Sequence, residues 1–401
     1  MNYVQAREII SRMEKAGSLY GTERVRSALR KLGNPQDKLR IIHVAGTNGK
    51  GTTCAFISAV LQQAGLRTGV FTSPAVFDYR EQFALNGEYI PEETYARLLT
   101  EILETNPQTT AFETEFCLAL LYFARSQADF AVIECGLGGR EDATNAIEKK
   151  ELAVIASVAY DHMHILGSTL TEIAEQKFGI VQNCPLITFA QDEEVMKVLR
   201  RAEKCVVAEK AQALSDTEFF YQGKTYRMPD VTDARMQDAT LAIEVAEYLG
   251  IDAESIHRGI ARSGLCGRWE RMERFGHRFV LDGAHNPNAL QALCNALKRY
   301  GYAPGETAMI VGMFRDKDLH ANARELLAFA PHRIFTVIAP TARGTDAKTL
   351  QSVFLQNGLQ AESAESMEQA LQAAMRYKNI VICGSFSVLA KAKKILTGER
   401  P

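Results

Sequence analysis

The sequence predicts an α/β protein with two domains, each built on a mostly parallel sheet flanked by helices. Two series of short apolar runs alternate with helical segments, which is the pattern of parallel strands joined by helices. A glycine-rich turn follows the first of these runs, as in many nucleotide-binding domains. The length of 401 residues is sufficient for two hydrophobic cores.

The first series starts with the apolar run Ile41–Ala45, which ends in the glycine-rich turn. A helix is expected over Ala55–Ala64 and a second strand over Gly69–Phe71. Uninterrupted apolar strands between helices are typical of a sheet that is covered on both faces. The other expected elements are a hairpin around Asn86-Gly87, a helix over Phe116–Arg125, and strands over Phe130–Glu134 and Leu152–Ala156.

A second series begins near Arg278. Its expected strands are Phe279–Leu281, Met309–Val311, Ile334–Val337 and Ile380–Ile382, with a helix over Pro287–Lys298. We place the domain boundary in the charged segment Arg271–His277, which gives domains of 1–272 and 277–401. The second is of ordinary size for a small α/β domain.

Composition excludes several classes of protein. A net charge of -2 gives no basic footprint for nucleic acid and no polybasic patch for a membrane. The eight cysteines include no C-x-x-C pair, which argues against a zinc ribbon or a disulfide scaffold. The start, Met1–Tyr20, lacks the apolar core of a signal peptide, and no run is long enough to span a membrane. We therefore expect a soluble cytoplasmic protein. We also expect a monomer whose partners are small molecules.

The strongest local signal is the segment Gly46–Thr53, between an expected strand and an expected helix. Glycines allow backbone N–H groups to converge, while the helix N-terminus and Lys50 add positive charge. A threonine hydroxyl could reach Mg²⁺ or a phosphate. A glycine-rich turn with a solvated lysine is the alternative, because the spelling differs from G-x-x-x-x-G-K-[ST]. The predicted nucleotide contacts here are Gly46, Thr47, Asn48, Gly49, Lys50, Gly51 and Thr52.

The spelling H-V-A-G-T-N-G-K-G-T over His43–Thr52 resembles the folylpolyglutamate synthase and dihydrofolate synthase family, which belongs to the Mur ligase superfamily. The resemblance implies an N-terminal ATPase domain of P-loop type and a smaller, Rossmann-like C-terminal glutamate-ligase domain. It covers nearly the whole chain, because further motifs follow in the family's order. They are T-S-P at 72–74, T-A-F-E at 110–113, E-C-G-L-G-G-R at 134–140, D-A-T-N at 142–145, D-H-M-H-I-L-G at 161–167, A-E-Q-K-F-G-I at 174–180, G-R-W-E at 267–270 and D-G-A-H-N-P at 282–287.

The resemblance implies a Mg²⁺ site formed by Ser73, Glu134 and His162. From the residues alone, a carboxylate at the end of a strand can bind Mg²⁺. A serine at the same edge of a sheet would face the expected ligand crevice. A turn serine and a strand-end acid without a metal are the alternatives. His164 occupies a variable position of the motif and is left out.

The resemblance also implies where the substrate binds: Phe112, Glu113, Gly139, Arg140 and Asn286. From the residues alone, Thr110–Glu113 is a helix start with a threonine cap and an acid in the first turn. The glycines before Arg140 would allow a substrate to approach the backbone. Asn286 before Pro287 would also serve as a helix N-cap, which is compatible with a functional role.

Lys177 is the position that the resemblance marks as a catalytic lysine that CO₂ can carbamylate. Carbamylation turns the ammonium into an anion, and it requires a neutral amine, which burial favours. A surface lysine on a helix is the alternative. Phe178 departs from the small residue that is usual in the family.

In the second domain, the resemblance assigns Arg268 to the phosphates of ATP, Asp282 to its ribose, and His285 to the catalytic site. A guanidinium suits phosphates because its donors form a fixed fork.

Three positions depart from the family and concern substrate and nucleotide. Ala75 stands where many relatives have histidine, and Gln82 where arginine is common. Asp238 replaces an asparagine that faces ATP, and a carboxylate near phosphates repels them unless a metal is bound.

The function implied is an ATP-dependent ligase that adds L-glutamate to a folate or dihydropteroate carboxylate through an acyl phosphate, with ATP and Mg²⁺. The choice between the two pterins stays open. Alternatives are another Mur-type amino-acid ligase, a P-loop ATPase that is not a ligase, and a non-catalytic folate-binding protein. The phosphate loop begins only some 45 residues into the chain, which disfavours a cell-wall ligase with a further N-terminal domain.

Overall fold

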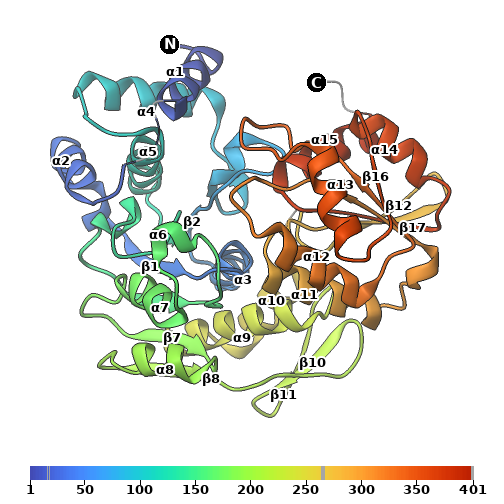
Figure 1. Cartoon of the computed structure of the whole chain (residues 1–401). Helices are drawn as coiled ribbons and strands as arrows, with labels where there is room; N and C mark the ends of the chain where they lie inside the picture. The colour runs from blue at the N-terminus through green and yellow to red at the C-terminus, as the bar shows by residue number, and fades with distance from the viewer. Residues whose placement is uncertain (16, 18, 263–266, 399–401) are drawn as a thin grey trace. The chain divides into compact units, whose positions relative to one another are not determined.

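The computed structural model describes residues 1–15, 17, 19–262 and 267–398; Cys266, one of the eight cysteines, lies outside these ranges. The chain forms two compact units (Figure 1). The first consists of Met1–Ala159 and Met163–Gly264, and the second of Tyr160–His162 and Leu265–Pro401. The expected α/β class is confirmed in both.

An eight-stranded sheet is the centre of the first unit, in the order β4-β3-β2-β5-β1-β6-β7-β8. All neighbours are parallel except β2 with β3 and β3 with β4, which form the expected hairpin edge. The carboxyl ends of the parallel strands therefore meet at one edge, where ligands bind in such sheets. The strands are β1 (Arg40–Ala45), β2 (Thr68–Phe71), β3 (Phe83–Leu85), β4 (Glu88–Tyr89), β5 (Phe130–Glu134), β6 (Leu152–Ile155), β7 (Leu186–Phe189) and β8 (Cys205–Ala208).

Helices cover both faces of this sheet because its central strands are apolar on both sides. Ile41 faces one core, while Ile42 and Val44 face the other. Helices α3 (Lys50–Gln63), α9 (Asp233–Tyr248) and α10 (Ala253–Arg262) pack together on one face. The remaining helices of the unit are α1 (Tyr3–Lys15), α2 (Glu23–Lys31), α4 (Glu92–Glu104), α5 (Ala111–Arg125), α6 (Met163–Leu166), α7 (Leu170–Phe178) and α8 (Glu193–Leu199), with short 3-10 turns η1 (Pro35–Lys38), η2 (Tyr79–Gln82) and η3 (Ala143–Ala146).

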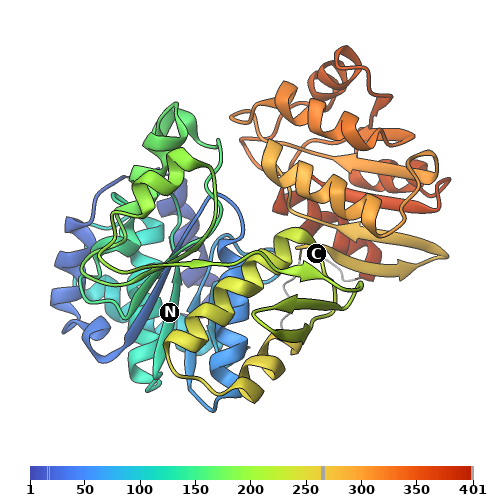
Figure 2. The ribbon, with the colours of Figure 1, turned by 90° about the horizontal axis from the view of Figure 1, so that it is seen from below.

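A small antiparallel sheet in the first unit was not predicted from the sequence. It contains β9 (Gln212–Ala213), β10 (Glu218–Tyr221) and β11 (Lys224–Arg227) in the order β11-β10-β9. Figure 2 shows these strands, in yellow-green, beside α10, and the buried Phe219 and Tyr226 join the core under α9 and α10.

The second unit contains a six-stranded sheet in the order β12-β13-β17-β14-β15-β16, parallel except for β12 with β13. Arg271–His277, where we expected the domain boundary, forms the β12–β13 hairpin of this unit. The strands are β12 (Glu270–Arg274), β13 (His277–Leu281), β14 (Thr307–Val311), β15 (Arg333–Thr336), β16 (Ala361–Ser363) and β17 (Asn379–Cys383). The helices are α11 (Pro287–Arg299), α12 (Leu319–Phe329), α13 (Ala347–Gln356), α14 (Met367–Ala374) and α15 (Phe386–Thr397), with the turn η4 (Pro304–Glu306). Among the described helices, none is long and apolar enough to cross a membrane.

Candidate active site

The predicted phosphate loop lies between β1 and α3, as the sequence indicated. Gly49 has φ of 84°, a conformation that side chains with a Cβ rarely adopt. A Cβ at this position would lie 2.3 Å from Oδ1 of Asp238 on α9, so a larger residue would displace this carboxylate. The carboxylate of Asp238 accepts a hydrogen bond from the Thr53 hydroxyl at 3.3 Å.

The loop is fixed by the segment that follows β6. The backbone N–H of Thr47 donates to the carbonyl of Ser157 at 2.5 Å, and that of Asn48 donates to the Ser157 hydroxyl at 3.2 Å. The Thr47 hydroxyl accepts from the N–H of Ala159 at 3.0 Å and donates to its carbonyl at 3.1 Å. The loop is thus preorganised before any ligand binds.

Lys50 begins helix α3 and reaches back over the loop. Its Nζ lies 3.2 Å from the carbonyl of Gly46, 3.4 Å from that of Thr47 and 4.0 Å from Oε1 of Glu134. A cation at a helix N-terminus, above a glycine turn, is an arrangement that attracts phosphate.

Glu134 ends β5 and is only 2% exposed. Its Oε2 accepts a hydrogen bond at 3.2 Å from the N–H of Ser73, which follows β2. The structure thus brings Ser73, Glu134 and Lys50 together at one sheet edge. A carboxylate and a hydroxyl are hard oxygen donors that fit Mg²⁺. Since no group of three His, Cys, Asp or Glu side chains among the described residues could hold a metal, water or ligand oxygens would complete the coordination.

His162 is grouped with the second unit, so its place beside Glu134 and Ser73 stays a prediction. Its Nε2 lies 3.4 Å from Nζ of Lys317 and 3.8 Å from Oδ1 of Asp161. Burial raises the pKa of Asp161, but the Lys317 ammonium at 2.7 Å together with His162 and His285 outweighs burial and lowers that pKa well below its usual range.

The glycine loop, residues Gly136–Arg140 after β5, lies against the last turn of α7. The N–H of Arg140 donates to the carbonyl of Gln176 at 2.7 Å, and a Cβ on Gly139 would lie 2.7 Å from the same oxygen. Lys177, in this turn, is only 2% exposed, which contradicts the surface-lysine alternative. The guanidinium of Arg140 is half exposed and lies 3.4 Å from Glu175.

Phe112 and Glu113 start helix α5, behind the predicted Thr110 cap. The Phe112 ring packs at 5.7 Å from Phe71, and a Cβ on Gly136 would lie 2.8 Å from its edge. Glu113 is 1% exposed, accepts from the N–H of Thr110 at 2.7 Å and receives two hydrogen bonds from Arg24, at 2.7 and 3.1 Å. These contacts give Glu113 a structural role, while its predicted role in substrate binding stays a prediction.

In the second unit, Asp282 follows β13 and accepts backbone N–H groups of Trp269 at 2.8 Å and Ala284 at 2.9 Å. The Arg268 guanidinium lies 4.5 Å from the centre of the Phe386 ring. The two residues that were assigned to the nucleotide therefore lie at adjoining turns of the same unit.

His285 and Asn286 follow the same strand. The pKa of His285 is lowered to about 4, mainly by burial and then by Lys317, so the imidazole is neutral at pH 7. Its Nδ1 donates to the carbonyl of Gly283 at 2.7 Å. Asn286 caps α11 through the N–H of Ala289 at 2.9 Å and also donates to Asp161 at 2.9 Å. The expected N-cap role of Asn286 is thus observed, while its predicted role in substrate binding stays a prediction.

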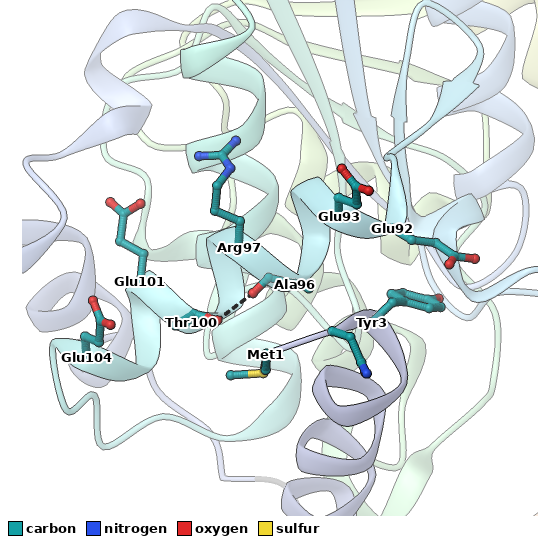
Figure 3. A pocket seen from close by; sticks show the side chains of 10 residues that line it. Met1, Tyr3, Glu92, Glu93, Ala96, Arg97, Thr100, Glu101 and Glu104 are labelled. Carbon is teal, nitrogen blue, oxygen red and sulfur yellow. Dashed lines mark hydrogen bonds between the residues drawn. The ribbon is translucent and has the colours of Figure 1, made fainter.

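A separate hollow of about 760 Å³ lies between α1 and α4. Figure 3 shows the side chains that line it. Four glutamates line it, together with Arg97 and the N-terminal residues. The negative charge of four carboxylates would repel a polyphosphate. None of the predicted site residues lines the hollow, so it does not define the active site.

Comparison with known proteins supports the same region. The Mur ligase middle domain matches residues 44–245, and the Mur ligase glutamate ligase domain matches 267–386. A dihydrofolate synthase/folylpolyglutamate synthase of Bacillus subtilis is 31% identical, over 98% of this chain and 99% of its own length. The chain belongs to this family of Mur ligases. The predicted family, fold class and class of enzyme are confirmed.

Two solved structures share the whole fold of this Mur ligase. One is Escherichia coli FolC in complex with DHPP and ADP, with a TM-score of 0.89 and 28% identity, covering 99% of this chain and 98% of that chain. The other is a bifunctional folylpolyglutamate synthase/dihydrofolate synthase with Mn, AMPPNP and L-glutamate bound, with a TM-score of 0.86 and 27% identity, covering 98% of each chain.

Sequence reasoning missed several residues near the site of this Mur ligase. The contact of Asp238 with Gly49 and the pairing of Arg24 with Glu113 join residues 189 and 89 positions apart. Lys150, buried beside the glycine loop, was also missed. No local motif marks such contacts, although an aspartate in place of the family's asparagine did mark position 238.

Proposed function

We propose that the chain joins L-glutamate to the carboxylate of a folate or dihydropteroate, using ATP. The observation that carries the proposal is the convergence of Lys50, Glu134 and Ser73 at the phosphate loop, in a chain that matches both Mur ligase domains. The domain division at 1–272 and 277–401, the monomeric state, the cytoplasmic location and the absence of a nucleic-acid partner are parts of the proposal that stay predictions.

ATP binds with its phosphates over the Gly46–Thr52 loop. The N–H groups at the N-terminus of α3 face the phosphate oxygens, and Lys50 offsets their charge. Ser73, Glu134 and His162 are the proposed ligands of Mg²⁺, which, when bound, would neutralise part of the phosphate charge. Arg268 and Asp282 are the proposed nucleotide contacts of the second unit, and His285 is its proposed catalytic residue.

The reaction has two steps. A carboxylate oxygen of the pterin substrate attacks the γ-phosphorus of ATP, the bond to the β-phosphate oxygen breaks, and an acyl phosphate and ADP form. The amine of glutamate then attacks the acyl carbon, the carbon–oxygen bond to phosphate breaks, and the amine proton is released. Exclusion of water protects the acyl phosphate from hydrolysis.

Lys177 is proposed to carry a carbamate. Its amine is buried, and burial favours the neutral form that reacts with CO₂. The nitrogen–carbon bond forms as a proton leaves, which gives an anion that can orient Mg²⁺. Removal of the amine in Lys177→Ala should lower kcat, and a short-chain acid that fills the carbamate space should partly restore it. Full activity of the variant without such an acid would contradict this role.

The proposed substrate contacts are Phe112, Glu113, Gly139, Arg140 and Asn286. Phe112 is the best supported of these, because its ring packs over Gly136 of the glycine loop and offers an apolar surface to a pterin ring. Ala75 and Gln82 remove cations that the family commonly has, so anionic chains on the substrate would bind more weakly.

Phosphate release from Mg-ATP with L-glutamate, with dihydropteroate or tetrahydrofolate added in turn, tests the proposal. Release that requires both glutamate and one pterin, with a product heavier by one glutamyl unit, is expected. Release that needs no amino acid would instead indicate a P-loop ATPase. Pterin binding without release would indicate a non-catalytic binder, and release with another acceptor would indicate a different Mur-type ligase.

A further inference from the structure

A second buried lysine lies close to the turn that carries Lys177. Lys150 precedes β6 and is only 8% exposed, although a charged side chain is rarely buried without partners. Its Nζ donates to Oδ1 of Asn145 at 2.7 Å and to the carbonyl of Ile180 at 2.8 Å. Burial lowers the pKa of Lys150 to about 8. The two acceptors favour the ammonium, so Lys150 is a poor candidate for a carbamate, which would be an anion facing two oxygens.

Asn145, the partner of Lys150, also forms hydrogen bonds with two backbone segments. It is 2% exposed, and its Nδ2 lies 3.1 Å from the carbonyl of Arg140 and 3.1 Å from the carbonyl of Gly179. Both donors of the amide and its carbonyl oxygen therefore have partners. One segment is the glycine loop, and the other is the turn that ends α7.

These two segments are in direct contact, with no room for side chains between them. A Cβ on Gly179 would lie 2.5 Å from Cα of Arg140, and one on Gly139 would lie 2.9 Å from the carbonyl of Lys177. The N–H of Arg140 also satisfies the carbonyl of Gln176, in the last turn of α7. The position of the glycine loop and the position of the Lys177 backbone are thus set together.

We propose that Lys150 and Asn145 form a buried clamp that positions Lys177 and the Gly139–Arg140 loop for catalysis. The inference rests on the proposed function, because it assigns positioning residues to that reaction. Neither residue lies in the phosphate loop, and neither is a proposed ligand of ATP or Mg²⁺. Loss of the clamp should therefore lower kcat far more than it lowers the affinity for Mg-ATP, because the phosphate loop is left intact.

The test compares Lys150→Met with Lys149→Met. Lys149 is the exposed neighbour, so its variant makes the same chemical change outside the clamp. We expect Lys150→Met to lower kcat at least tenfold with the dissociation constant for Mg-ATP within twofold of the wild-type value, whereas Lys149→Met leaves both unchanged. Lys150→Arg, which keeps a charged donor, should recover part of the lost kcat. An unchanged kcat in Lys150→Met, or an equal loss in kcat and nucleotide affinity, would overturn the proposal.

The pairing of the two residues is tested by Asn145→Leu. If they act as one unit, the double variant with Lys150→Met loses no more kcat than the more affected single variant. Losses that multiply would show two independent effects and contradict the clamp.

A measurement without turnover separates this inference from the proposed function. Amide hydrogen exchange is followed in peptides that cover 136–146 and 174–181. Faster exchange in both peptides of Lys150→Met, but not of Lys149→Met, is expected because the hydrogen bonds between the segments open more often. If exchange is unchanged, the clamp is wrong even for an active ligase; if the wild type shows no ligase activity but exchange rises, only the proposed function fails.

Discussion

The carboxyl edges of the two parallel sheets use their charged side chains in different ways. In the first unit, Nζ of Lys50 lies 4.0 Å from Glu134, beyond hydrogen-bonding distance, and contacts loop carbonyls. In the second unit, Nζ of Lys317 lies 2.7 Å from Asp161, which also accepts from Asn286. The first pair lies beside the phosphate loop, where its charges can act on a ligand, whereas the second is a short buried ion pair whose disruption leaves one charge without its counter-ion. Substitutions in the first pair should therefore change activity, and those in the second should change stability.

The largest effect on activity is expected from Lys50→Ala. Loss of this cation should lower kcat by about 10²–10³-fold, as for other groups that stabilise transition-state charge. The melting temperature should stay close to that of the wild type, because Nζ makes only long contacts, with the loop carbonyls at 3.2 and 3.4 Å and with Glu134 at 4.0 Å. Phosphate release and a thermal melt measure the two quantities. A variant that remains active would contradict the phosphate-loop assignment.

Lys317→Met should have its main effect on stability. Removal of the ammonium leaves the buried Asp161 carboxylate without its counter-ion, although Asn286 still donates to it, and this loss costs about 3 kcal/mol. Urea unfolding followed by the fluorescence of Trp269, the single tryptophan and a core residue of the second unit, reports this change. Lys378→Met is the control, since its pair with Glu306 is exposed and should be worth under about 1 kcal/mol. If Lys317→Met and Lys378→Met lost the same free energy of unfolding, the stabilising role of the Lys317–Asp161 pair would be wrong.

Glu115 extends the comparison to a buried acid of the first unit that lies away from the phosphate loop. Burial raises its pKa to about 7, although the hydroxyls of Tyr79 and Tyr95, at 2.6 and 3.0 Å, and Arg7, at 3.6 Å, oppose the shift. Since the folded pKa exceeds the unfolded one, the folded state prefers the protonated acid, and that stability is lost as pH rises toward and through 7.

The stability of the wild type relative to Glu115→Gln should consequently fall by about 2 kcal/mol between pH 5 and pH 8. Urea titrations of both proteins across this range measure the difference. A difference that does not depend on pH would contradict a raised pKa. At one fixed pH, the kcat of Glu115→Gln should be close to that of the wild type, because Glu115 takes part in no step of the proposed reaction.

The smallest effect is expected from a pair of glycine substitutions. Gly49 and Gly65 both have positive φ, of 84° and 78°, so alanine strains the backbone by a similar amount at each. Only at Gly49 would the new Cβ meet Asp238, while Gly65 has no heavy atom within 4 Å. Gly49→Ala should raise the KM for ATP about tenfold, a change of about 1.4 kcal/mol, and Gly65→Ala should leave it unchanged. Equal values in the two variants would contradict the close contact between α9 and the loop.

Much of the fold could be predicted because apolar runs identify buried strands. The run ending in Val44-Ala45 predicted β1, and the glycine-rich turn that follows predicted the loop before α3. The small sheet of β9–β11 was missed. Strand β9 has only two residues, and β11 has the sequence Lys-Thr-Tyr-Arg, which contains no apolar run.

The site could be predicted where its residues form motifs, and could not where they meet through folding. Glu134 and Ser73 were expected together because each ends a strand of one parallel sheet, and the hydrogen bond between them agrees. The clamp of Lys150 and Asn145 depends on Ile180 and Gly179, some 30 positions away, so sequence spacing gave no sign of it. Burial of Lys177 is favourable for a carbamate, but the sequence left a surface lysine on a helix open, and only the structure excludes it.

Transfer of ¹⁸O from the substrate carboxylate to phosphate tests the central claim most directly. The pterin carboxylate is labelled at both oxygens and incubated with Mg-ATP and L-glutamate, and the released phosphate and the amide product are analysed by mass spectrometry. An acyl phosphate predicts one labelled oxygen in each phosphate and the other in the new amide. If the released phosphate carried no ¹⁸O, however fast it was released, activation of the carboxylate by this chain would be contradicted.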